Sequence, residues 1–210
     1  MEITLIDYTG MGHYALEHAI NVLIFTKNTR LNMSVVNFQD IADWPRSKKI
    51  EELAYMANTI PSSWEFISYT FACEGVTRAC THQMVRTRTA SFAQQSMRVT
   101  NMSRFQYRTP PNLKDGKEIG GAMDSKEYTY DSCMGVIQTA YYDLIQLGAV
   151  EEDARGILPT NILTNIVCHY NLRTMSDLVK SRSGGRTQDE YRDVIKAMAN
   201  RILEVHPWAE

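Results

Sequence analysis

The sequence lacks the features that mark membrane-spanning, secreted and disulfide-rich proteins. No segment approaches the run of about 20 apolar residues that spans a bilayer, and the N-terminus has no basic flank before a long apolar stretch. The four cysteines are widely scattered without a Cys-x-x-Cys pair, so neither a zinc knuckle nor a disulfide framework is indicated. We therefore expect a cytoplasmic protein with no membrane partner.

Internal repeats, low-complexity tracts and Pro/Ser-rich linkers are also missing. With 210 residues and a hydrophobic content of 44%, the chain has the size of one domain that buries a full core. We predict a single domain over residues 1–210. The polar, breaker-rich segment at 110–121 reads as a loop, and the sequence assigns no role to it.

Glycine, histidine and cysteine patterns exclude two kinds of cofactor site. There is no Gly-rich dinucleotide fingerprint, so a flavin or nicotinamide has to be held in another way. His13 and His18 lie five residues apart, which misses the i, i+4 spacing of a helical metal site. Cys80 and His82 are two residues apart and point away from each other on a helix, which favours Cys80 as packed core. We predict no metal.

Acidic residues are missing from one long stretch of an otherwise balanced chain. The net charge of −2 argues against generic nucleic-acid binding, which usually shows a basic excess. Between Gly75 and Leu113, however, there is no Asp or Glu. All the bases in that stretch are arginines, whose planar fork grips phosphate or carboxylate at two points. They are Arg78, Arg86, Arg88, Arg98, Arg104 and Arg108. We expect an anionic ligand to bind here.

Hydrophobic periodicity predicts a mixed, mostly helical class. Segments 2–8 and 66–74 are short, aromatic and β-branched, which is typical of strands. Apolar residues recur at three and four in the expected helices, which cover 16–24, 76–88, 134–145, 175–182 and the segment that follows Thr187. Thr187 to Glu190 has the pattern of a capping box. In the helix expected at 76–88, Arg78, His82 and Arg86 lie four apart, and solvated bases on an exposed face explain that spacing equally well.

The residues after Arg88 favour a phosphate site. Residues 91–98 are small and polar with no acid, and hydroxyls, amides and backbone N–H groups of this kind can wrap a phosphate. Ser91 and Ser96 are poor candidates for nucleophiles, because no histidine is within local reach and no Gly-x-Ser-x-Gly elbow exists.

The same region resembles a known enzyme family. The segment from Glu74 to Arg88, followed after seven residues by Ser96 and then Arg98, is similar to the signature of flavin-dependent thymidylate synthases (ThyX type), which is Arg-His-Arg, seven residues and Ser. Thr87 replaces the central histidine of that signature, and Ile60 and Phe66 stand where two more histidines are expected. The resemblance extends over residues 59–192, because three further motifs follow in the same order and spacing. These are Ala154-Arg155-Gly156-Ile157-Leu158-Pro159, Asn171-Leu172-Arg173, and Arg182 with Gln188-x-Glu190.

The resemblance implies a fold, a reaction and partners. The fold is α+β, mostly helical with a small central, mainly antiparallel sheet. The reaction is the C5-methylation of dUMP to dTMP, with methylenetetrahydrofolate and reduced nicotinamide (NADPH) as co-substrates and FAD as cofactor. The enzyme is expected to be a homotetramer with shared active sites.

The resemblance also implies residue roles. The implied nucleotide-binding residues are Gln83, Arg86, Gln94, Gln95, Ser96, Met97, Arg98, Arg155 and Arg182. The implied flavin-binding residues are Ser62, Arg86, Thr87, Arg88, Gln94, Asn171, Arg173 and Asp177. Arg182 is the implied catalytic residue, placed against the pyrimidine. Because Arg182 continues the apolar stripe of Met175, Leu178 and Val179, we expect it to point inward; a helix-end arginine that reaches water is the alternative.

Three other functions are consistent with the residues. Thr87 favours an enzyme on the same scaffold that modifies a different pyrimidine nucleotide, by dCMP methylation or by hydroxymethylation. A nucleotide- or nucleic-acid-binding protein without catalysis is the second, although residues 75–104 offer only Phe92 for base stacking, so we predict no nucleic-acid partner. A degenerate relative that keeps the nucleotide pocket and has lost flavin is the third.

Overall fold

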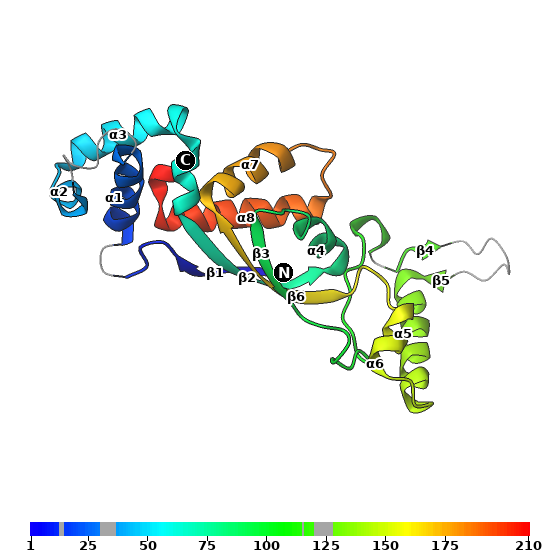
Figure 1. Cartoon of the computed structure of the whole chain (residues 1–210). Coiled ribbons are helices and arrows are strands. Elements are labelled where there is room, and N and C mark those ends of the chain that lie inside the picture. The colour runs from blue at the N-terminus through cyan, green and yellow to red at the C-terminus, as the bar shows by residue number, and fades with distance from the viewer. Residues whose placement is uncertain (13–14, 30–36, 115, 120–127) are drawn as a thin grey trace. The chain divides into compact units, whose positions relative to one another are not determined.

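The computed structural model describes residues 1–12, 15–29, 37–114, 116–119 and 128–210 (Figure 1). His13 and residues 115, 120 and 121 of the loop at 110–121 lie outside the described residues. The α-helices are α1 (Ala15–Asn28), α2 (Phe38–Ala42), α3 (Arg46–Thr59), α4 (Arg78–Met84), α5 (Tyr130–Gln146), α6 (Glu151–Ala154), α7 (Leu172–Arg182) and α8 (Asp189–Val205). Short 3-10 helices are η1 (Pro61–Phe66), η2 (Pro111–Leu113), η3 (Arg155–Ile157) and η4 (Pro207–Ala209).

The main sheet has the strand order β1-β2-β6-β3 (Figure 1). Its strands are β1 (Glu2–Tyr8), β2 (Ser68–Thr77), β3 (Ala90–Gln94) and β6 (Leu163–Asn171). β1 and β2 run antiparallel, with Glu2 opposite Glu74, and the register shifts between Leu5 and Asp7. A second, two-stranded antiparallel sheet pairs β4 (Glu118–Ile119) with β5 (Tyr128–Thr129). This confirms the predicted α+β class with a small, mainly antiparallel sheet.

The chain divides into two compact units by its internal contacts. Unit 1 comprises Met1–Glu74, Gln83–Ala93 and Val167–Glu210, and unit 2 comprises Gly75–His82 and Gln94–Ile166. Strands β2 and β6 therefore contribute residues to both units. That residues 1–210 form a single domain stays a prediction.

The core of unit 1 follows from two sequence periods. Strand β2 alternates, so that Tyr69, Phe71 and Cys73 are buried while the residues between them are not fully covered. Helix α8 buries one stripe and packs against α7 and β1 (Figure 1). The stripe includes all the residues expected from its spacing: Tyr191, Val194, Ile195, Met198 and Ile202.

Unit 2 has its own hydrophobic cluster. Its buried members are Met102, Phe105, Tyr141, Ala154 and Ile162, and half-buried apolar residues of α5 pack on them. Helix α5 begins with the capping box of Thr129 and Ser132, which the sequence analysis did not identify. The cluster anchors α6 and η3, which carry two residues of the site described below.

Several sequence-based boundaries were wrong. The helix expected at 76–88 is shorter, because β-branched Val76 and Thr77 belong to β2 and the helix ends at Met84. Arg86 therefore does not continue a helical row with Arg78. The capping box expected from Thr187 does not form, since α8 starts after Gln188 without a side-chain cap. Strands β3 and β6 were not expected at all.

Candidate functional site

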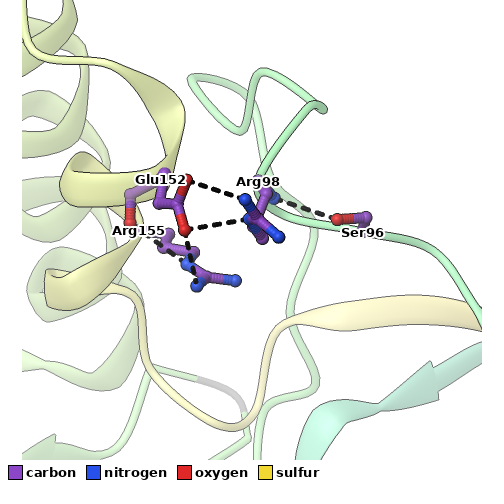
Figure 2. Close-up of polar contacts among 4 residues, drawn as sticks. All are labelled: Ser96, Arg98, Glu152 and Arg155. Carbon is purple, nitrogen blue, oxygen red and sulfur yellow. Dashed lines mark hydrogen bonds and ion pairs between the residues drawn. The ribbon is translucent and has the colours of Figure 1, made fainter.

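Two predicted nucleotide-binding arginines meet at one acidic residue, Glu152, in unit 2 (Figure 2). Arg98 contacts Glu152 with two nitrogens: Nε lies 2.9 Å from Oε1, and Nη2 donates to Oε2 at 3.0 Å. Arg155 donates from Nε to the backbone carbonyl of Glu152 at 3.1 Å, and its Nη2 lies 4.0 Å from Oε1. All three side chains are solvent-accessible, and the guanidinium groups remain open to a ligand.

Arg78 adds a third cation to this group. Its Nη1 donates to the carbonyl of Gln95 at 3.1 Å, while its Nε is buried without a hydrogen-bond partner among the described residues. Burial lowers the pKa of Arg78, and the positive charge of nearby Arg155 lowers this pKa further. Like charges held close together and an unsatisfied buried N–H are both costly, and a bound anion offsets the two costs.

The polar run after β3 has mixed roles. Ser96 is exposed, and its Oγ accepts from the backbone N–H of Arg98 at 3.2 Å, which shapes the loop (Figure 2). Gln94 donates from its amide to Thr81 Oγ1 at 2.8 Å. The half-buried side chain of Met97 packs on the hydrophobic cluster of unit 2. Of these three, Ser96 has the most accessible side chain for contact with a ligand.

A polar cavity of about 280 Å³ adjoins Gln95 within unit 2. Arg104 is the one charged residue among its described lining residues, and no acid lines the cavity. The lining residues are Gly75, Gln95, Thr100, Asn101, Met102, Arg104, Phe105, Gln106, Leu163, Thr164 and Asn165. The backbone of this cavity is fixed where Asn165 accepts from the N–H of Gly75 through its side chain and from the N–H of Gln95 through its carbonyl.

In unit 1, three segments that carry predicted flavin-binding residues meet at the start of α7. Arg173 forms an ion pair with Glu65 of η1 at 2.5 Å, and the N–H of Leu172 donates to the carbonyl of Ile67 at 2.8 Å. Thr89, directly after Arg88, lies 2.9 Å from Thr174 between hydroxyl oxygens. These contacts bring the segments of Ser62, Arg88 and Arg173 together.

The side chains around this junction differ in what they offer. Asn171 caps α7, because its Oδ1 accepts from the N–H of Thr174 at 2.8 Å. Arg86 and Arg88 are exposed, and no carboxylate among the described residues pairs with either. Thr87 is half-buried in the turn that closes α4, and Asp177 is exposed on α7. Two cations without a carboxylate partner, in the segment that leads to this junction, suit an anionic cofactor.

Arg182 and Gln83 also belong to unit 1. Arg182 is exposed at the end of α7, so the expectation that it points inward was wrong. Its guanidinium carbon lies 5.9 Å from the centre of the Tyr191 ring, a cation–π contact that orients the group without covering it. Gln83 donates from its amide to the side chain of Gln188. Gln188 is the N-cap residue of α8, and its side chain does not cap the helix.

Sequence reasoning missed Glu152 and gave Arg78 no place among the nucleotide-binding residues. Glu152 lies three residues before Arg155, which is a helical i, i+3 spacing and a usable local signal. Its contact with Arg98 joins residues 54 positions apart and has no such signal. The stretch from Gly75 to Leu113 contains no acid in sequence, but in the folded chain Glu152 contacts it at Arg98.

Other candidates for chemistry are inert in the structure. Cys80 is fully buried, as expected, and His82 is exposed. Cys73 and Cys168 are buried on neighbouring strands, with sulfur atoms 3.7 Å apart, and the hydrogen bond with the Cys168 sulfur, together with burial, raises the pKa of the Cys73 thiol. Within the described ranges, no group of three or more His, Cys, Asp or Glu side chains gathers as a metal site.

Comparison with known proteins identifies the family. The family model described as thymidylate synthase complementing protein (Thy1) matches residues 4–208. The chain belongs to this family. A relative from Clostridium tetani named flavin-dependent thymidylate synthase is 30% identical over 99% of the chain and 84% of its own length. Relatives of the same name come from Sulfolobus acidocaldarius (30%; 99% of the chain, 74% of the relative) and Nitratidesulfovibrio vulgaris (35%; 80% and 73%).

The Thy1 match confirms the resemblance and the enzyme class that the sequence predicts. It covers both units, so neither lies outside the family's domain. Within the part of the chain that the structure describes, no helix is long and apolar enough to cross a membrane. The roles of the individual site residues stay predictions.

Proposed function

We propose that this Thy1 chain methylates dUMP at C5 to give dTMP, with methylenetetrahydrofolate as carbon donor and NADPH as reductant. The family match along residues 4–208 carries this proposal, and relatives named flavin-dependent thymidylate synthase along 99% of the chain support it. Arginines that stay charged at any working pH supply what a phosphate monoester needs.

The phosphate is assigned to Arg98, Arg155 and Ser96 of unit 2, with Arg78 as an addition to the predicted set. Arg98 and Arg155 already meet at Glu152, and Arg78 carries an unsatisfied buried N–H near Arg155. Each charge-assisted hydrogen bond to the phosphate contributes about 1.5–3 kcal/mol. The remaining nucleotide contacts are assigned, as the resemblance implies, to Gln83, Arg86, Gln94, Gln95 and Met97.

Arg182 is assigned to the pyrimidine ring. Activation of C5 pushes negative charge onto N3 and O4, and an oriented guanidinium stabilises that charge as it develops. Arg182 is exposed and rests on Tyr191, so it is both accessible and oriented. One preorganised donor of this kind typically contributes about 3 kcal/mol to transition-state stabilisation.

The junction at the start of α7 fits an anionic flavin cofactor. Arg86 and Arg88 are exposed cations without carboxylate partners among the described residues, and they suit the pyrophosphate of FAD. Arg173 sits on the first turn of α7, held by Glu65, and Ser62, Thr87, Gln94, Asn171 and Asp177 complete the implied set. When bound, FAD supplies the reducing equivalents that convert the transferred methylene to a methyl group.

A homotetramer with shared sites completes the proposal. The resemblance implies that different subunits contribute residues to one site. Light scattering of the purified protein, with and without dUMP, measures the oligomeric state.

The visible spectrum of the purified protein tests the function most directly. A flavin band that shifts when dUMP is added supports neighbouring flavin and nucleotide sites. A protein that stays colourless with excess FAD contradicts the proposed redox chemistry and favours the degenerate relative.

A second assay addresses the base, because Thr87 stands where the family signature has histidine. C5 proton release is followed from dUMP and dCMP in parallel, together with product identification by mass. Turnover of dUMP alone to dTMP supports the proposal. Turnover of dCMP, or a hydroxymethyl product, favours the variant enzyme on the same scaffold.

A further inference from the structure

Glu152 is an acidic residue beside the arginines that the proposed function assigns to the phosphate (Figure 2). Its contacts indicate its role there. Two roles are conceivable for an acid between two phosphate-binding arginines. It can occupy the position of the phosphate and compete with it, or it can hold the arginines from the side. The atoms that make the contacts distinguish these roles.

Arg98 binds Glu152 through one edge only. Its Nε and Nη2 contact the two carboxylate oxygens at 2.9 and 3.0 Å, so the N–H groups of Nη1 are not used by Glu152. A guanidinium has five N–H donors, and this side-on pairing fixes its plane while leaving its terminal edge available. An occupant of the phosphate position is expected to take that terminal edge instead.

Arg155 is held by the same residue through a different atom. Its Nε donates to the backbone carbonyl of Glu152 at 3.1 Å, and its Nη2 lies 4.0 Å from the nearest carboxylate oxygen, too far for a hydrogen bond. The terminal nitrogens of Arg155 therefore do not grip the carboxylate. This argues against Glu152 as the occupant of the anion position.

Charge leads to the same role. Arg78, Arg98 and Arg155 bring three positive charges together, and Glu152 offsets one of them in the free protein. A phosphate monoester dianion then makes the whole cluster neutral. Without Glu152, the arginines repel one another and have more freedom to lose when the ligand binds.

We propose that Glu152 is a positioning residue that orients Arg98 from its Nε edge and anchors Arg155 from its backbone, so that both present their terminal N–H groups to the nucleotide phosphate. This inference rests on the proposed function for the identity of the ligand. It predicts that Glu152 acts on the phosphate through Arg98 and has no effect on the nucleoside part.

The test compares Glu152→Gln with Asp153→Asn, a control that removes one charge from the exposed neighbour in the same helix. Equilibrium dialysis measures the Kd of dUMP and of deoxyuridine, which lacks the phosphate. We expect Glu152→Gln to weaken dUMP binding about tenfold and to raise the KM for dUMP with kcat nearly unchanged. Deoxyuridine binding and the Asp153→Asn protein stay at wild-type values.

A double-mutant cycle with Arg98→Ala tests whether Glu152 acts through Arg98. In the Arg98→Ala background, Glu152→Gln is expected to change dUMP affinity by less than about twofold. The inference is overturned if the Glu152→Gln protein binds dUMP as tightly as the wild type or more tightly. It is also overturned if Glu152→Gln weakens deoxyuridine binding as much as dUMP binding, or if the effects of Glu152→Gln and Arg98→Ala on dUMP affinity are additive.

An NMR measurement separates failure of the inference from failure of the proposed function. The Nε–Hε signal of Arg98, assigned by its loss in Arg98→Ala, is expected to exchange slowly with water in the wild type and quickly in Glu152→Gln. If the wild type binds dUMP no better than deoxyuridine, the proposed phosphate site fails. An Arg98 signal that is unchanged by Glu152→Gln refutes the positioning role in either case.

Discussion

The arginines that follow α4 and those that meet at Glu152 have different surroundings. Arg86 and Arg88 are exposed in unit 1 without a carboxylate partner among the described residues. Arg98 and Arg155 of unit 2 are both fixed by Glu152. One set is already oriented in the free protein, whereas the other is free to become ordered when a ligand arrives.

This difference has an energetic meaning. Ordering a long arginine side chain costs up to about 2 kcal/mol of conformational entropy. The arginines held by Glu152 have lost part of that entropy during folding, so a small ligand with few contacts can bind them. A large cofactor makes more contacts and can offset the cost of ordering Arg86 and Arg88. The comparison therefore assigns the nucleotide phosphate to the held set and the flavin pyrophosphate to the free set, of which Arg86 is also assigned to the nucleotide.

The largest effect is expected from Arg182, which has no carboxylate partner in the described part of the chain and instead rests on Tyr191. Arg182→Ala should reduce kcat by at least about 100-fold, because it removes a donor that contributes about 3 kcal/mol in the transition state. Flavin absorbance should persist, and single-turnover measurements separate chemistry from binding. Activity near the wild-type level would remove the role assigned to Arg182.

The next largest effects test the assignment of the two arginine sets. Arg98→Ala should weaken the free energy of dUMP binding by about 2 kcal/mol while flavin content stays constant. Arg88→Ala should lower flavin affinity while dUMP affinity changes little. Titrations of each ligand against both variants give the four values. If the two variants weaken both ligands alike, the division into a nucleotide set and a flavin set is wrong.

The elements that sequence periodicity predicted are those with one strongly apolar face. Helix α8 and its buried stripe from Tyr191 to Ile202 were predicted because charged residues fill the opposite face. Strand β6 was missed although its burial alternates, because Thr164 and Cys168 are among its buried residues and give a weak hydrophobic signal. The helix predicted at 76–88 was too long, because Val76 and Thr77 belong to strand β2.

The site was predictable to the extent that it is local. The acid-free stretch and the order of motifs led to Arg98 and Arg155, and the structure brings these two together. Glu152 was not found, because a contact over 54 residues depends on how α6 packs in unit 2. The direction of Arg182 was wrong for a similar reason: it lies in the last turn of α7, where the buried stripe has ended.

A pH titration extends the comparison from binding to stability. The exposed arginine pairs contribute little to folding, whereas His206 is buried in unit 1 and its Nδ1 shares a hydrogen bond of 2.8 Å with the Tyr69 hydroxyl. Burial lowers the pKa of His206 to about 4. The unfolded chain, with a pKa near 6.5, binds a proton at a higher pH than the folded chain does.

Stability should therefore fall as the pH drops from about 6.5 to about 4, by roughly 3 kcal/mol from this residue. Urea unfolding at closely spaced pH values measures the fall. A His206→Gln protein is the control, because it cannot take up this proton and should show a flatter profile over the same window. Parallel profiles for the two proteins would exclude His206 as the cause.

The smallest expected effect distinguishes the two arginine–carboxylate pairs. Glu65 meets Arg173 through the single contact between Nη1 and Oε1, and both side chains are nearly half exposed. Glu152 instead holds Arg98 at two nitrogens. An exposed pair with one contact is worth less than about 1 kcal/mol, so Glu65→Gln should lower flavin affinity by less than about threefold and leave the unfolding free energy unchanged. Flavin titration and urea unfolding provide both values. A loss as large as that expected for dUMP binding in Glu152→Gln would mean that one contact orients an arginine as well as two contacts do.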